Sequence, residues 1–311
     1  MEIVLILIQQ VITMFILVGI GYLMFRGKKI SLEGSKTLGN ILIFLSLPCV
    51  IINGFTVERT PEHIRGLAFS ALLAVLILLI SVVISRMFFR RDAIAAFAGA
   101  FSNPGFFGVP LITACLSSGA VFYVASFIAL LNMLQWTYGV AIMTAEGSHE
   151  KKKLSELITP RKILTAPFMI AILIGLFLFF SGLELPQIVT KCITFLSGLN
   201  TPLAMFTVGV YLAQTRFREM LGKGKLYLIS AVRLLVIPAA AILILRFIPE
   251  SFTEMKLALL ISIACPVGSN IAVYAQLHNK DYAYAVETVI ISTLMSVITI
   301  PLITAAALRI W

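Results

Sequence analysis

The stretch Gly99–Leu111, with the sequence GAFSNPGFFGVPL, interrupts an apolar segment that is long enough to cross a membrane. Proline removes a backbone donor and glycine has little helix preference, so this stretch predicts a break in the helix. A break leaves up to about four N–H and four C=O groups unpaired, and each costs several kcal/mol in hydrocarbon. The break must therefore lie against protein, water or a ligand. An ordinary proline kink in a membrane helix is the alternative interpretation.

The composition is typical of a membrane protein. Of the 311 residues, 60% are hydrophobic and 12% are charged, whereas soluble domains carry about 25% charged residues. Ten apolar segments have roughly the length of a membrane span. They cover residues 3–25, 37–56, 66–87, 93–116, 119–145, 163–182, 187–214, 226–247, 256–277 and 284–308. The sequence thus predicts an all-α integral membrane protein with ten transmembrane helices.

The basic residues predict the orientation of the chain. Lys and Arg are concentrated in every second connector, starting with the first, and connectors of this kind face the cytoplasm. Both termini are then expected outside, in a multi-pass protein of the inner (plasma) membrane. The net charge of +10 largely reflects this bias. Because the basic residues are spread over many short connectors, the charge does not indicate binding to nucleic acid.

A second interruption lies in the corresponding place of the second half of the chain. The connector 146–162 divides the ten segments into two sets of five, and the ninth segment contains Cys265–Ile271, CPVGSNI. Ser46-Leu47-Pro48 and Asn200-Thr201-Pro202 also occupy matching places. Since five is an odd number, a second repeat enters the membrane in the opposite orientation, as in many secondary transporters. The sequence predicts two inverted five-helix repeats whose broken helices 4 and 9 cross at the bilayer midplane.

The candidate site lies at this crossing. All Asp and Glu residues lie at segment ends or in connectors, which disfavours a cation antiporter, and no Cys or His spacing indicates a metal or a cofactor. Neutral amides and free N–H groups suit a carboxylate better. The predicted substrate-binding residues are Asn103, Gly105, Ser269, Asn270, Ser46, Asn132 and Gln135. The predicted helix-break residues are Pro104, Gly108, Pro110, Pro266, Gly268 and Ile271.

The polar residues of this set also have purely structural interpretations. Asn103 and Asn270 can cap the ends of the broken helices. Asn132 and Gln135, one helical turn apart, can form interhelical hydrogen bonds. Ser46 can bond back to its own helix.

Arg233 is a basic residue that lies well inside an apolar segment, about two turns into the eighth. An arginine at the bilayer centre costs about 2.5–3.5 kcal/mol on insertion scales. We therefore expect its side chain to extend toward the cytoplasmic interface. The alternative is that it supplies positive charge to the cavity.

Several motifs together resemble the auxin efflux carrier family, which includes the plant PIN exporters and many bacterial transporters. Asn103–Leu111, NPGFFGVPL, resembles the fourth-helix pattern N-x-x-x-x-G-x-P-L of that family. Cys265–Asn270 resembles its ninth-helix signature. Val232-Arg233 with Pro238 is similar to its eighth helix, and Ser292–Pro301 is similar to the tail of its bacterial members.

The resemblance implies a fixed scaffold, often dimeric, and a moving transport domain that carries organic acids by an elevator-like motion. The scaffold would comprise residues 1–56 and 163–214, the transport domain 57–145 and 215–311, and the cytoplasmic loop 146–162. Asn103 matches the substrate-contacting asparagine of the family, and Pro110 matches its crossover proline. Plant members have a proline where this chain has Ile271, which leaves the ninth break point open.

The sequence therefore predicts a carrier that exports a small organic anion, such as a dicarboxylate or an auxin-like carboxylate. It is expected to need no cofactor and to form a homodimer through the scaffold helices. Two alternatives remain, namely a sodium-coupled organic-anion symporter of the bile-acid type and a ligand-binding membrane sensor. An enzyme is not expected, because there is no HExxH motif, no aspartate pair within a segment and no histidine within a segment.

Overall fold

The computed structural model describes residues 2–117, 119–145 and 165–311, and every regular element in these ranges is a helix. The predicted cytoplasmic loop 146–162 lies outside the described residues. The elements of the first half are α1 (Glu2–Arg26), α2 (Leu32–Ile41), η1 (Leu42–Ser46), α3 (Leu47–Gly54), α4 (Pro61–Phe88), α5 (Ala93–Ala100), η2 (Pro104–Gly108), α6 (Val109–Cys115), α7 (Ala120–Leu134), η3 (Gln135–Gly139) and α8 (Val140–Ala145). Those of the second half are α11 (Pro167–Ser181), α12 (Gln187–Gly198), α13 (Asn200–Gln214), α14 (Phe217–Leu221), α15 (Gly224–Ala231), η4 (Val232–Val236), α16 (Ile237–Leu245), η5 (Glu250–Phe252), α17 (Thr253–Ala264), α18 (Asn270–Leu277) and α19 (Tyr282–Ile310).

Among the described residues, seven helical stretches are long and apolar enough to cross a membrane, which confirms the predicted class of all-α membrane protein. They are Glu2–Arg26, Leu32–Gly54, Pro61–Phe88, Ala120–Thr144, Gln187–Gln214, Gly224–Leu245 and Tyr282–Ile310. Each coincides with a predicted segment. Two of the remaining predicted segments, 93–116 and 256–277, are divided into shorter helices. The eight residues of α5 are about 12 Å long, which is too short to cross a bilayer.

Three of the π-helical segments precede a proline by two residues. η1, η2 and η4 end at residues 46, 108 and 236, and they are followed by Pro48, Pro110 and Pro238. A proline ring clashes with the carbonyl four residues earlier and offers it no N–H. The wider turn relieves this clash, so these helices continue through the proline. Such π-turns are frequent at functional sites, and the predicted site residues Gln135 and Arg233 lie in η3 and η4.

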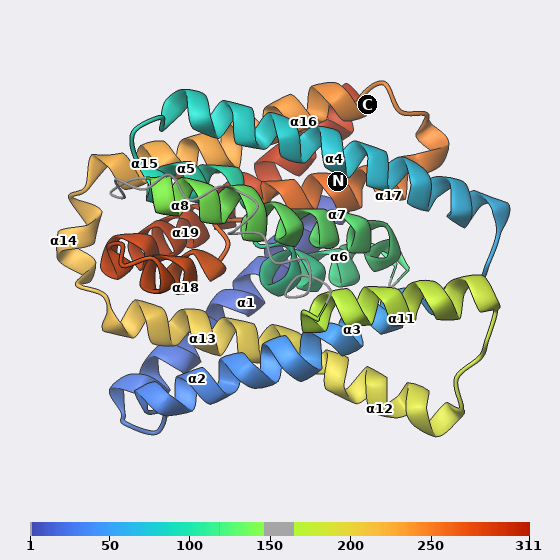
Figure 1. The fold of residues 1–311 in the computed structure, drawn as a ribbon, viewed down its shortest axis with the longest axis horizontal. Helices are drawn as coiled ribbons and strands as arrows, with labels where there is room; N and C mark the ends of the chain where they lie inside the picture. The colour runs from blue at the N-terminus through green and yellow to red at the C-terminus, as the bar shows by residue number, and fades with distance from the viewer. Residues whose placement is uncertain (1, 118, 146–164) are drawn as a thin grey trace.

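The helices form two groups (Figure 1). α2, α3, α11, α12 and α13 lie along the lower side of the view, where α3 contacts α11 and α12, and α1 contacts α13. The other group includes α4, α5, α7 and α15–α19; α4 contacts α5 and α7, and α17 contacts α7, α16 and α19. Both interrupted segments, α5–α6 and α17–α18, belong to this second group.

The contact between α1 and α13 depends on two glycines. A Cβ atom added to Gly209 would lie 2.7 Å from the backbone nitrogen of Tyr22 and in contact with the carbonyl oxygen of Val18. A Cβ atom on Gly21 would lie 2.7 Å from the Cα atom of Phe206. Small residues allow membrane helices to pack this closely.

We therefore expect Gly209→Ala to destabilise the protein by about 1–3 kcal/mol, the usual cost of overpacking a rigid interface. The measurement is thermal unfolding of the full chain in detergent. Gly19→Ala is the matched control, because a Cβ atom on Gly19 of α1 meets no atom within 4 Å. Equal melting temperatures for the two variants would contradict the packing argument.

Candidate functional site

The two interruptions, residues 101–103 and 265–269, lie against each other at a contact that we call the crossing. α5 ends at Ala100 and the helix resumes at Pro104, while α17 ends at Ala264 and the helix resumes at Asn270. The extended residues Ser102 and Val267 form an isolated antiparallel bridge between them. In addition, the Gly268 N–H donates to the Phe101 carbonyl at 3.0 Å. Backbone groups freed by one break are thus satisfied by the other, as burial in a membrane requires.

Glycines permit this close approach. A Cβ atom on Gly268 would lie 2.9 Å from the Ser102 carbonyl oxygen, and one on Gly108 would lie 3.0 Å from the Cys265 sulfur. A Cβ atom on Gly105 would lie 3.3 Å from Cδ1 of Leu47, which belongs to α3. The predicted break residues Gly108 and Gly268 therefore leave room for neighbouring atoms, in addition to having a weak helix preference.

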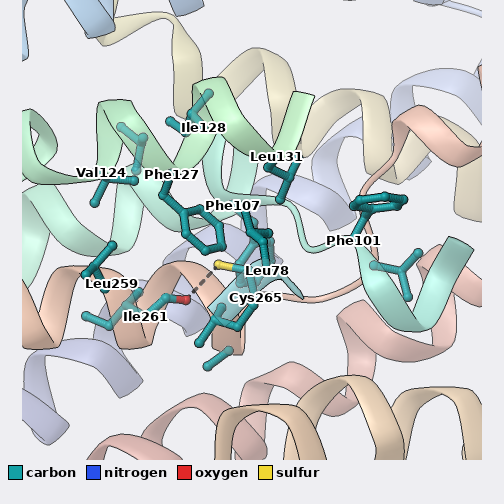
Figure 2. Close-up of a cluster of buried hydrophobic side chains, with 14 of the residues drawn as sticks. Leu78, Phe101, Phe107, Val124, Phe127, Ile128, Leu131, Leu259, Ile261 and Cys265 are labelled. Atoms are coloured by element: carbon teal, nitrogen blue, oxygen red, sulfur yellow. Dashed lines mark hydrogen bonds between the residues drawn. The ribbon is translucent and has the colours of Figure 1, made fainter. Parts of the chain in front are cut away.

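An apolar cluster supports the crossing on one side. Figure 2 shows Phe107, which follows the first break, beside Phe127 of α7 and Cys265 of the second break. The Cys265 thiol donates to the carbonyl of Ile261, at 3.1 Å. All four residues are at most 1% exposed. The crossing is therefore held in a packed core.

A cavity of about 380 Å³ lies beside the crossing, between the two groups of helices. This volume is within the usual range for small-molecule sites. From the first group it is lined by Ile43, Phe44, Leu47, Thr165, Ala166, Pro167 and Phe168. From the second group it is lined by Phe106, Asn132, Trp136, Asn270, Val273, Tyr274 and Leu277. Its walls are thus mainly aliphatic and aromatic, with a few neutral polar groups.

Three predicted amides gather at the cavity and the crossing. Asn270, the first residue of α18, donates from Nδ2 to Oε1 of Gln135 at 3.2 Å. Gln135 is 1% exposed, and its Nε2 has no partner among the described residues. Asn132 donates to the Ile128 carbonyl at 2.8 Å, within its own helix. A buried amide nitrogen without an acceptor is a donor available to a ligand.

The other predicted substrate residues have different surroundings. The Oδ1 of Asn103 accepts from the Phe106 N–H at 3.3 Å, so Asn103 caps the helix that resumes after the first break. Ser269 occupies the N-cap position of α18 without a capping side-chain bond. The cavity lining among the described residues does not include Asn103, Gly105, Ser269, Ser46 or Gln135. Ser46 is buried and donates to the Leu196 carbonyl at 2.9 Å, which joins η1 to α12.

The remaining break residues mark where the helices resume. Pro104 is the first residue of the resumed helix, where its missing N–H has no cost, and Pro110 lies in its second turn. Pro266 lies in the extended stretch before the bridge residue Val267. Ile271 is the second residue of α18, so the second interruption spans residues 265–269.

The structure corrects the expectation for Arg233. Its side chain does not reach the cytoplasmic interface but is fully buried, with 0% exposure. Nη1 donates to the carbonyls of Gly99 and Ala100, both at 3.0 Å, and to Oγ of Ser81 at 3.3 Å. Nη2 donates to the carbonyl of Ile263. Snorkelling was the wrong prediction because these acceptors satisfy the guanidinium inside the protein.

The sequence did not predict a role for Asn200. This residue occupies the place in the second half of the chain that Ser46 occupies in the first half. Its Nδ2 donates to the Gly105 carbonyl at 3.1 Å and so joins α13 to the first break. Asn200 is 2% exposed. The available signal was a polar residue two positions before a proline within an apolar segment.

The carboxylate of Glu287, near the start of α19, is paired with a lysine away from the cavity. Both carboxylate oxygens of Glu287 accept from the Lys223 ammonium, at 2.6 and 2.7 Å. Asp92 caps α5 and forms an ion pair with Lys225 at 2.5 Å. No carboxylate is among the described residues that line the cavity.

Comparison with known proteins gives the same class. Residues 6–304 match a family described as membrane transport protein. A protein of Rhizobium meliloti (strain 1021), named "Putative malonate transporter", is 27% identical over 301 residues, covering 93% of this chain and 92% of that protein. Both matches include the two interruptions. The chain therefore belongs to the membrane transport protein family, the auxin efflux carrier-like family that its motifs resemble.

Proposed function

We propose that this protein is a secondary carrier that moves a small organic anion, such as a dicarboxylate or an auxin-like carboxylate, across the membrane. The observation that carries the proposal is the pair of facing interruptions beside a cavity lined by amides. The Nε2 of Gln135, which has no partner among the described residues, offers a donor at the crossing, and α18 begins at Asn270, which lines the cavity. Donors and a helix N-terminus favour a carboxylate.

The proposed motion follows from the position of the cavity. Leu47 and Phe168 line it from one group of helices, and Phe106, Asn132 and Asn270 line it from the other. Sliding of the second group along the first would carry a bound ligand through the membrane. The hydrogen bond between Asn200 and Gly105 joins the two groups and would have to open during this motion.

In this proposal ten helices form two inverted repeats, and broken helices 4 and 9 cross at the midplane. The scaffold comprises residues 1–56 and 163–214 and forms the homodimer. The transport domain comprises 57–145 and 215–311. The termini lie outside and transport is outward, as the basic connectors and the family resemblance favour.

The walls of the cavity favour a carboxylate attached to an apolar body. Trp136 and Tyr274 meet edge to face, with ring centroids 5.5 Å apart, and Phe44, Phe106 and Phe168 complete the aromatic lining. The name of the Rhizobium relative favours a dicarboxylate. A test panel therefore needs both malonate and aromatic acids such as phenylacetate.

The deciding experiment is uptake of labelled organic acids into liposomes that contain the full chain. We expect saturable uptake of at least one acid without a sodium gradient. Uptake that requires sodium would favour a symporter, and binding without uptake would favour a sensor. If the protein neither binds nor takes up any organic acid, the proposal is contradicted.

Asn270→Ala should lower this uptake at least about tenfold, because a hydrogen bond to a charged group contributes about 1.5–3 kcal/mol. Gln276→Ala is the matched control, because Gln276 is an exposed amide on the same helix. We expect Gln276→Ala to transport at the wild-type rate. Similar rates in the two variants would remove Asn270 from the site.

A further inference from the structure

Arg233 joins the carbonyl ends of both interrupted helices. Gly99 and Ala100 are the last two residues of α5, and Ile263 is the last but one of α17. The guanidinium donates to the carbonyls of all three. The hydroxyl of Ser81 supports this arrangement, since it donates to the Ala100 carbonyl at 2.7 Å. One fully buried cation thus serves the C-terminal ends of two helices.

A buried guanidinium normally needs a counter-charge. The ion pairs of the described residues include Arg216–Glu219, Lys223–Glu287 and Lys225–Asp92, and no carboxylate among these residues pairs with Arg233. The C-terminal end of a helix carries about −0.5 charge. Two such ends amount to about −1 and therefore balance the guanidinium.

In the described part of the chain, no carboxylate pairs with the N-terminal ends of the two helices that resume after the breaks. The helix Pro104–Cys115, formed by η2 and α6, and α18 both begin at the crossing, and each N-terminal end carries about +0.5 charge. The Nε2 of Gln135 provides an independent sign of a ligand, because it is a buried donor without a partner. It lies 3.6 Å from the Cβ position of Gly268, at the crossing itself.

We propose that Arg233 is a positioning residue that turns the crossing into a site for one negative charge. By neutralising the two carbonyl ends, it prevents them from cancelling the positive potential of the two donor ends. The ligand class is an organic monoanion, and a dicarboxylate would bind with one carboxyl group protonated. This inference rests on the proposed function and specifies its substrate class.

The test compares each carboxylate with its neutral amide, for example phenylacetate with phenylacetamide, by calorimetry on the full chain in detergent. We expect the wild type to bind the carboxylate at least tenfold more tightly than the amide. Arg233→Lys should keep this ratio within threefold, because it keeps the charge. Arg233→Met should lower the ratio at least tenfold. Loss of packing alone would weaken the binding of both ligands and leave the ratio of their affinities unchanged.

Ser81→Asp gives a second test that does not remove the guanidinium. The Ser81 oxygen already accepts from Nη1 of Arg233 at 3.3 Å, so a carboxylate there would pair with it. The ratio should fall as in Arg233→Met. A wild-type ratio in a folded sample of either variant would overturn the inference while leaving the proposed carrier intact.

The restriction to one charge is tested with malonate and malonamate, its half-amide, at alkaline pH, where malonate carries two charges. We expect malonamate to bind at least as tightly as malonate. Tighter binding of the doubly charged malonate would overturn the inference. If the wild type binds no organic acid, both this inference and the proposed function fail.

Discussion

Asn103→Asp should abolish transport of organic anions while leaving the protein folded. Asp and Asn are equally good N-cap residues, so an Asp carboxylate can still accept the Phe106 N–H that Oδ1 of Asn103 accepts at 3.3 Å. The same carboxylate would place a negative charge at the helix end proposed to attract the ligand. Two like charges about 4 Å apart repel by about 4 kcal/mol at an effective dielectric constant of about 20. That energy corresponds to a roughly thousandfold loss of uptake.

The initial rate of labelled-acid uptake into liposomes measures this loss, and the melting temperature in detergent reports the fold. Asn103→Ser is the matched control, since serine also caps a helix but carries no charge. We expect Asn103→Ser to retain far more uptake than Asn103→Asp, at a similar melting temperature. Wild-type uptake by Asn103→Asp would show that the first helix end does not contact the anion.

The breaks themselves were predictable because their cause is local. Pro104 removes a backbone donor, and the helix stops at Ala100 and resumes at Pro104. The second break was harder to place, because the family proline is replaced by Ile271. In the structure the helix resumes at Asn270, one residue before Ile271. Composition and apolar length likewise predicted the class of the fold, since lipid leaves few choices.

The contacts that shape the site were not predictable, because they join residues far apart in the chain. Ser46 donates to Leu196, 150 residues away. Arg233 donates to Ala100, 133 residues away. Nothing near either residue in the sequence indicates which acceptor lies opposite. The depth of Arg233 in its segment suggested a route to the interface, whereas the acceptors inside the protein decided its position.

The meeting of the two breaks depends on the absence of a side chain at residue 268, and Gly268→Val should therefore be among the most damaging single substitutions in this chain. Its Cβ atom would lie 2.9 Å from the Ser102 carbonyl oxygen, which is backbone and cannot move aside alone. The Ser102–Val267 bridge and the Gly268 to Phe101 hydrogen bond would separate. Backbone groups left unpaired in the membrane cost several kcal/mol each.

We expect Gly268→Val to lower the free energy of unfolding by about 3 kcal/mol or more, since overpacking and lost backbone hydrogen bonds act together. Uptake should fall with it, because the donor ends of the two helices no longer face a common site. Gly198→Val is the matched control, as a Cβ atom on Gly198 meets no atom within 4 Å. Thermal unfolding and gel filtration in detergent compare the two. If Gly268→Val melts and transports like Gly198→Val, the two breaks do not need to touch, and the site must be sought elsewhere in the cavity.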